Sequence, residues 1–180
     1  MGTRVRPCRL IAAFPFGKNW ERARTLQRGG MNTDEQYMKL AVEEARQAKH
    51  AGELPIGAVI TRKGKVIARN RCREAAEKTV LAHAEMHAVN DACKALGTTD
   101  LSDCVIYCSN EPCLMCSAAI FQAKIPRVVI GAARSDLPHL MRERKFRIEH
   151  LAEDSGYSLE IVRGVLKEKV LGLFDGIRKR

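Results

Sequence analysis

Two short segments of the chain hold residue types that can bind a metal ion and move a proton. They are His83-Ala84-Glu85 and Pro112-Cys113-Leu114-Met115-Cys116. One imidazole and two thiolates can hold a zinc ion in tetrahedral geometry and leave its fourth position open for water. An open position distinguishes a catalytic zinc site from a structural one, which has four protein ligands. In such a site Glu85 would stay off the metal and could transfer protons.

The cysteine segment has the spacing of ligands at the beginning of a helix. Cys113 and Cys116 are three positions apart, so both thiolates face one side of a helical turn and can reach one ion. A helix N-terminus also favours the thiolate over the thiol. We expect Pro112 at the first helical position, where no backbone N–H is required, followed by a buried helix over residues 114–120.

The histidine segment sets a different condition, because His83 and Glu85 are only two positions apart. In the middle of a helix their side chains would point to opposite sides. The pair can serve one site only near a helix end. We therefore expect a helix over residues 82–96, closed by Gly97, with the pair at its start.

Other interpretations of these residues remain open. His87 follows His83 by four positions, as in zinc proteases, but that motif has Glu directly after the first His, where Ala84 stands here. A Cys-x-x-Cys pair alone also occurs in redox and structural sites. A structural zinc site would use four cysteines: Cys104, Cys108, Cys113 and Cys116.

The remaining periodicity predicts the elements that position these residues. A capping box at residues 33–36 begins a helix that Gly52 ends, and the last helix is expected at residues 165–174. Residues 70–80 are expected to form a loop. Strands are predicted at residues 56–61, 65–69, 104–109, 127–131 and 158–162. Two strands followed by alternating helices and strands indicate a three-layer α/β/α sandwich with a central mixed sheet of about five strands.

Composition limits the class of protein. The 180 residues suffice for one domain with a real core. Seven cysteines without a regular disulfide spacing favour a reducing compartment, and we expect a cytoplasmic protein. No apolar run is long enough to span a membrane.

The first thirty residues differ in composition from the rest of the chain. They hold seven of the 31 basic residues and one of the 21 acidic residues, although the whole chain carries +10. We expect residues 1–30 to be a disordered basic extension and residues 31–180 to form the catalytic domain. The mild positive charge of that domain is compatible with RNA but does not demand it.

Together these motifs resemble the cytidine deaminase-like superfamily of zinc deaminases over about residues 33–175. The branch most similar holds tRNA adenosine deaminase, guanine deaminase and zinc-dependent cytosine deaminases. The resemblance runs through Pro55-Ile56-Gly57-Ala58-Val59-Ile60, Ala68-Arg69-Asn70-Arg71, Ala82-His83-Ala84-Glu85, Glu111-Pro112-Cys113-Leu114-Met115-Cys116 and Ile125-Pro126-Arg127-Val128-Val129-Ile130-Gly131.

The resemblance implies a role for individual residues and a homodimer. It implies one Zn²⁺ per chain, with His83, Cys113 and Cys116 as ligands and Glu85 as the proton shuttle. It also implies four residues as substrate contacts: Gly57, Ala58, Asn70 and Ala84. Ala84 would make its contact through its backbone N–H. The reaction would be hydrolytic replacement of a ring amino group by oxygen, with release of ammonia.

The substrate is less well determined by these motifs. Residues 92–97 and 104–109 resemble guanine deaminase, whereas residues 159–166 resemble tRNA adenosine deaminase, and residues 134–156 match neither. We expect this unmatched segment to shape the pocket mouth. Because most of the net charge lies in the extension, we predict a free base or nucleoside, guanine- or cytosine-like, as the substrate. The alternatives are adenosine in the anticodon loop of a tRNA and, further off, a zinc-binding module without catalysis.

Overall fold

The computed structural model of the chain describes residues 32–142 and 144–177. The predicted extension at residues 1–30 and the basic C-terminal residues 178–180 lie outside the described residues. The helices are α2 (Asn32–His50), α3 (Glu74–Glu77), α4 (Ala84–Leu96), α5 (Leu114–Gln122), α6 (Ile148–Ser155) and α7 (Lys167–Leu171). The strands are β1 (Gly57–Arg62), β2 (Lys65–Arg71), β3 (Cys104–Asn110), β4 (Arg127–Ala132) and β5 (Glu160–Arg163), and two 3₁₀ turns are η1 (Arg134–Asp136) and η2 (Gly172–Phe174).

The five strands form one mixed sheet in the order β2-β1-β3-β4-β5. Strand β1 runs antiparallel to both β2 and β3, whereas β3, β4 and β5 are mutually parallel. The β1–β2 hairpin turns through Lys63 and Gly64, both with positive φ, between the strands predicted at residues 56–61 and 65–69. The predicted mixed sheet is therefore confirmed, and its parallel half has the helical connections that parallel strands require.

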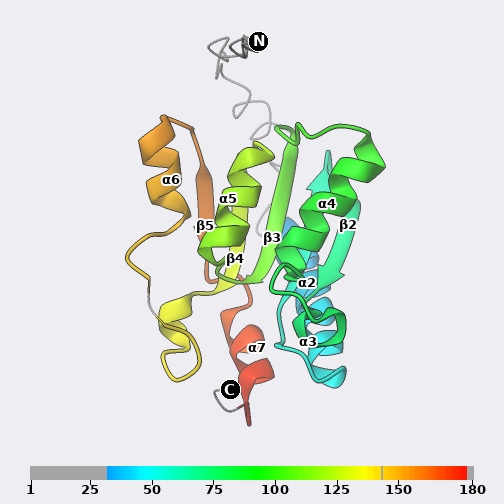
Figure 1. Cartoon of the computed structure of the whole chain (residues 1–180), viewed down its shortest axis with the longest axis vertical. Coiled ribbons are helices and arrows are strands. Elements are labelled where there is room, and N and C mark those ends of the chain that lie inside the picture. The colour runs from blue at the N-terminus through cyan, green and yellow to red at the C-terminus, as the bar shows by residue number, and fades with distance from the viewer. Residues whose placement is uncertain (1–31, 143, 178–180) are drawn as a thin grey trace, which may run out of the picture.

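Alternating side chains divide the core between the two faces of the sheet (Figure 1). Ile60, Ile106 and Ile130 face α4, α5 and α6 in one cluster. Val59 and Val129 face the opposite way and pack against α2. Helices cover both faces, so the predicted three-layer α/β/α architecture is confirmed.

Several predicted boundaries need correction. Helix α2 already includes Asn32, so Thr33 lies within the helix and is not its N-cap. Strand β2 extends to Arg71 and includes Asn70, which the sequence places in a loop, because residues 69–71 continue the pairing with β1. Pro112 precedes the N-cap of α5 and is not its first helical residue. The predicted last helix is split into α7 and η2.

Residues 133–147 connect β4 to α6 and are the part of the fold that sequence patterns left undescribed. They contain η1 and a turn, and Leu137 and Met141 are anchored in a third cluster with Val170 and Phe174. Phe174 is therefore a core residue, as its helical neighbours predict. In the described part of the chain, no helix combines the length and apolar character needed to cross a membrane.

Candidate functional site

The ends of two helices bring the predicted metal ligands together. His83 is the N-cap of α4 and Cys113 is the N-cap of α5, both with extended backbone, and Cys116 lies in the first turn of α5. Because the first N–H groups of a helix lack partners within the helix and carry positive partial charge, both helices favour anionic groups at this point. The prediction that the His83 segment lies at a helix start is confirmed.

The spacing of the three donor atoms fits a zinc ion. His83 Nδ1 lies 3.6 Å from Cys113 Sγ and 3.4 Å from Cys116 Sγ, and the two sulfurs are 3.6 Å apart. At tetrahedral angles, ordinary zinc bond lengths place sulfur and nitrogen about 3.6 Å apart and two sulfurs about 3.8 Å apart. The observed triangle therefore has the size of three edges of one zinc tetrahedron, with a fourth corner for water.

The other nitrogen of His83 contacts a carboxylate that the sequence interpretation missed. His83 Nε2 lies 3.4 Å from Glu74 Oε1 on the short helix α3. A histidine ligand generally donates its second N–H to a carboxylate or carbonyl, which fixes the ring orientation and increases its basicity. This contact favours Nδ1 as the metal-binding atom. No motif points to Glu74, because the predicted loop at residues 70–80 hides the helix that positions it.

The two thiols influence each other's protonation. Hydrogen bonds from Cys116 and then His83 outweigh burial and lower the pKa of Cys113 to about 3. The neighbouring Cys113 and burial raise the pKa of Cys116. A dication between two thiolates and an imidazole would favour the deprotonated form of both cysteines.

Glu85 is a buried carboxyl group in the first turn of α4. Its exposed fraction is 3%, and burial raises its pKa above the ordinary value of 4.5. Its Oε2 atom is buried without a hydrogen-bond partner among the described residues. A buried carboxyl with a raised pKa and a free oxygen can both accept and return a proton, as a general acid–base group must.

Two of the predicted substrate contacts lie at the same end of the sheet as the ligands. Ala84 is the first residue of α4 and follows the ligand His83 directly. Asn70 is 4% exposed, and it donates from Nδ2 to Asp91 Oδ2 at 2.8 Å. Its Oδ1 accepts a hydrogen bond from Arg73 at 2.7 Å. These two partners fix the amide orientation of Asn70, and no sequence motif indicates either of them.

The other two predicted contacts differ in the face of the sheet that they occupy. Ala58 is fully buried with the α4 and α5 cluster and pairs with Asn70 in the neighbouring strand. Gly57 faces α2 instead, because a Cβ on it would lie 2.2 Å from the carbonyl oxygen of Ala41. The structure therefore gives Gly57 a packing role between β1 and α2.

The alternative metal sites are not assembled. In the described part of the chain, the group of His, Cys, Asp and Glu side chains that could hold an ion consists of His83, Cys113 and Cys116. Cys104 and Cys108 are buried in the core, where desolvation raises the pKa of Cys104 to about 12 and that of Cys108 well above 9. His87 Nε2 lies 3.5 Å from Glu77 Oε2 and is not part of this group. The protease interpretation, which needs His87 at the metal, is therefore wrong. The four-cysteine interpretation, which needs Cys104 and Cys108 there, is also wrong.

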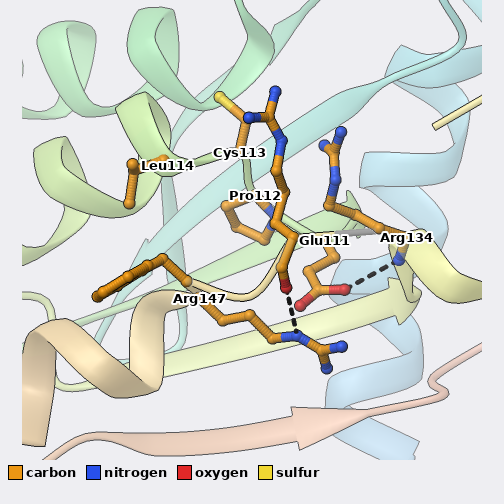
Figure 2. A pocket seen from close by; sticks show the side chains of 8 residues that line it. Glu111, Pro112, Cys113, Leu114, Arg134 and Arg147 are labelled. Atoms are coloured by element: carbon orange, nitrogen blue, oxygen red, sulfur yellow. Dashed lines mark hydrogen bonds between the residues drawn. The ribbon is translucent and has the colours of Figure 1, made fainter. Parts of the chain in front are cut away.

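A small pocket beside Cys113 contains residues that the motifs did not identify (Figure 2). It is lined by Glu111, Pro112, Cys113, Leu114, Arg134, Arg144, Phe146 and Arg147. Glu111 accepts the backbone N–H of Arg134 at 2.9 Å, which ties the connection after β4 to the cysteine segment. The expectation that residues 134–156 shape the pocket mouth fits this arrangement, and the run of basic residues there was the available signal.

Similarity to known proteins agrees with this geometry. Residues 31–132 match the family model of the cytidine and deoxycytidylate deaminase zinc-binding region. The tRNA-specific adenosine deaminase of Bacillus subtilis strain 168 is 38% identical over 160 residues, covering 83% of this chain and 94% of the relative.

Solved structures give the same result. One, from studies of A-to-I editing by tRNA:A34 deaminases, has a TM-score of 0.66 and 32% identity, covering 77% of this chain and 98% of that chain. A guanine deaminase from Nitrosomonas europaea has a TM-score of 0.70 and 25% identity, covering 77% and 81%. The sequence match spans more than half of the chain and includes all three donor residues of the zinc-sized triangle. The chain belongs to the cytidine and deoxycytidylate deaminase zinc-binding family.

Proposed function

We propose that the protein is a zinc-dependent hydrolytic deaminase that converts adenosine to inosine in a tRNA. The observation that carries this proposal is the 38% identity to a tRNA-specific adenosine deaminase over 94% of that enzyme. The sequence predicts adenosine in tRNA as the alternative substrate, after a free base or nucleoside. The similarity to tRNA deaminases supports this alternative better than the free base or nucleoside.

In this proposal His83, Cys113 and Cys116 hold the zinc ion, because their donor atoms form a triangle of zinc size. Zinc bound there supplies a water molecule of lowered pKa as the nucleophile. Glu74 holds the imidazole of His83 in the orientation that presents Nδ1.

Glu85 carries the proton chemistry. Its buried Oε2 accepts a proton from the attacking water and delivers it to the ring nitrogen next to the reacting carbon. The second water proton reaches the amino group, the carbon–nitrogen bond breaks, and ammonia leaves. The water oxygen remains on the ring carbon, which converts adenine to hypoxanthine. Burial raises the pKa of Glu85, and this favours uptake of the proton from the attacking water.

The substrate base would lie between β1, β2 and the N-terminus of α4. We assign the backbone N–H of Ala84 and the amide of Asn70 as its hydrogen-bonding contacts, with Ala58 as an apolar wall. Asp91 and Arg73 hold the Asn70 amide in one orientation, so that the site recognises one donor and acceptor pattern.

A free purine base is the second candidate substrate. The specific observation in its favour is the TM-score of 0.70 with a guanine deaminase, against 0.66 for the tRNA deaminase structure. The two candidates differ in what surrounds the reacting base, since a base within RNA brings phosphates and neighbouring bases with it.

The test compares zinc-loaded protein on an anticodon stem-loop with adenosine at the wobble position, on the same stem-loop with guanosine there, and on free guanine, cytosine and adenosine. We expect inosine to form in the first RNA with a kcat/KM at least about 100-fold above that for any free base or nucleoside, since remote binding energy serves catalysis. Faster ammonia release from guanine than from the stem-loop would establish the second candidate instead.

A further inference from the structure

A cluster of cations lies between β4 and the start of α6, and the chemistry above does not use it. We define the basic rim as Arg134, Arg142, Arg144, Lys145 and Arg147. Of these, Arg142, Arg144 and Lys145 are exposed. Among the described residues, no acidic side chain lies within ion-pair distance of these three.

The rim begins at the proposed metal site. The pocket beside Cys113 is walled by Arg134, Arg144 and Arg147 of the rim (Figure 2). A second, more open hollow adjoins it and is lined by Arg144, Lys145, Arg147, Glu149 and His150. Because Arg144 and Arg147 border both hollows, the cations follow a track that leads outward from the metal ligand Cys113.

Three acidic side chains among the described residues near the rim have cationic partners outside it. Arg163 of β5 forms an ion pair with Glu149 and lies 3.9 Å from Glu111. Asp136 pairs with Lys167 at 2.6 Å. The charges of Arg142, Arg144 and Lys145 can therefore attract an anion, and the described carboxylates that would repel one are partly neutralised by Arg163 and Lys167.

An aromatic side chain stands among these cations. Phe146 has 67% of its surface exposed, and its ring lies 5.4 Å from that of His150 at an angle of 50°. Leu114, which follows Cys113 and lines the same pocket, is 49% exposed. Exposed large apolar groups between arginines and lysines are the combination that binds single-stranded nucleic acid, because bases stack on rings while cations contact phosphates.

We propose that the basic rim and Phe146 bind the nucleotides that flank the target adenosine in a single-stranded RNA loop. The proposal rests on the function proposed above and identifies the surface that would select RNA over a free base. The rim cations contact backbone phosphates, and Phe146 stacks one flanking base outside the reaction pocket. A lone nucleoside monophosphate offers one phosphate and no second base, so it would use only part of a track that runs from Arg134 to Lys145.

Two variants separate the phosphate contacts from stacking. Arg144→Gln with Lys145→Gln removes two exposed cations, and Phe146→Ala removes the ring. The matched control, Lys63→Gln with Lys65→Gln, removes two exposed cations from the β1–β2 hairpin. This hairpin forms the edge of the sheet opposite β5. Binding of a labelled anticodon stem-loop to each zinc-loaded protein is measured by fluorescence anisotropy between 50 and 200 mM salt, with inosine formation followed in parallel.

We expect the rim variant to reduce the slope of log K against log salt by about 1.4, which is about 0.7 for each lost phosphate contact with a single strand. Phe146→Ala should weaken RNA binding roughly 5- to 150-fold with little change in that slope. Both should raise KM for the stem-loop more than they lower kcat, and the hairpin control should match the wild type in slope and KM.

Three results would overturn the inference, and they differ from one another. If the rim variant had the same slope and affinity as the hairpin control while the wild type formed inosine, the function would stand and the rim assignment would fail. If the rim variant lost affinity for adenosine monophosphate but not for the stem-loop, the rim would be a site for free nucleotides. If the wild type formed no inosine in any RNA, both the proposed function and this inference would fail.

Discussion

At the scale of single residues, the zinc-sized triangle has a carboxylate behind its imidazole corner, with Glu74 Oε1 3.4 Å from His83 Nε2. His83, Cys113 and Cys116 can be predicted as a set because their types and spacing suit one metal ion. Glu74 could not be predicted, because its contact with His83 depends on a one-turn helix in a segment without periodicity. Only the fold brings such partners near a ligand.

The role of Glu85 is tested by Glu85→Gln, which keeps the shape of the side chain and removes its proton-transfer group. We expect the rate of inosine formation to fall by about 10²- to 10⁴-fold, the usual contribution of a general acid–base group. Zinc content, measured by atomic emission, should stay at one per chain. Loss of the metal would instead identify Glu85 as a ligand and remove the open coordination position.

Glu74→Gln tests the carboxylate behind His83. We expect zinc affinity, measured by competition with a chromophoric chelator, to fall about 10- to 100-fold, because the imidazole loses its charged acceptor. Glu77→Gln is the matched control, since Glu77 lies on the same helix and faces His87 in place of a ligand. Equal zinc affinity in both variants would contradict the positioning role of Glu74.

At the scale of elements, periodicity located all five strands of the described residues, and two residues show where a tertiary partner decides the local structure. Asn70 has a polar side chain that favours a loop, yet pairing with β1 keeps it in β2. Gly57 belongs to a family motif that implies a substrate contact, and its packing against α2 is a tertiary contact that the motif does not reveal. Sequence patterns report local preference, and these two residues are placed by long-range contacts.

The close approach of β1 to α2 predicts the effect of Gly57→Ala. A Cβ would lie 2.2 Å from Ala41 O and 2.6 Å from Ala45 N, so the helix must shift. We expect a loss of about 1–3 kcal/mol in the free energy of unfolding, typical of overpacking, measured by urea denaturation. Gly172→Ala is the control, because the nearest atom to its Cβ is 3.9 Å away. Equal stability of both variants would exclude a packing role for Gly57.

An ion pair joins α2 to β4 and makes part of the stability depend on pH. Arg127 donates two hydrogen bonds to Asp34 at 2.9 and 2.8 Å, and Tyr107 donates a third at 3.1 Å. Burial raises the pKa of Asp34, but these donors outweigh burial and bring it below the ordinary value of 3.8. A carboxylate with a lowered pKa in the folded state stabilises the fold above about pH 3.8, and this contribution is lost as pH falls further.

Asp34→Asn should therefore reduce the free energy of unfolding by about 1.5–3 kcal/mol at pH 7, the range for hydrogen bonds to charged groups. The difference from the wild type should shrink as the pH falls below 3.8, when Asp34 takes up a proton. Thermal unfolding at pH 7, 5 and 3 measures it. A difference that stayed constant or grew toward pH 3 would contradict this linkage.

At the scale of the whole molecule, the sandwich gathers the residues of the proposed site at one end of its sheet. The N-termini of α4 and α5 supply the zinc-sized triangle, the end of β2 supplies Asn70, and the connection after β4 supplies the basic rim. The net charge of residues 31–180 favoured a free base as the substrate, because a net charge averages over the whole domain. The local concentration of cations beside Cys113 is a property of the fold. The predicted homodimer and cytoplasmic location remain predictions.

The central claim is that one zinc ion held by His83, Cys113 and Cys116 converts adenosine to inosine in tRNA. It is tested most directly by removing metal with a chelator, returning zinc stepwise, and measuring inosine in an anticodon stem-loop after each addition. We predict a rate that rises linearly from near zero and reaches a plateau at one zinc per chain. Full activity before zinc is returned would contradict the claim, as would a one-zinc protein that deaminates guanine but forms no inosine.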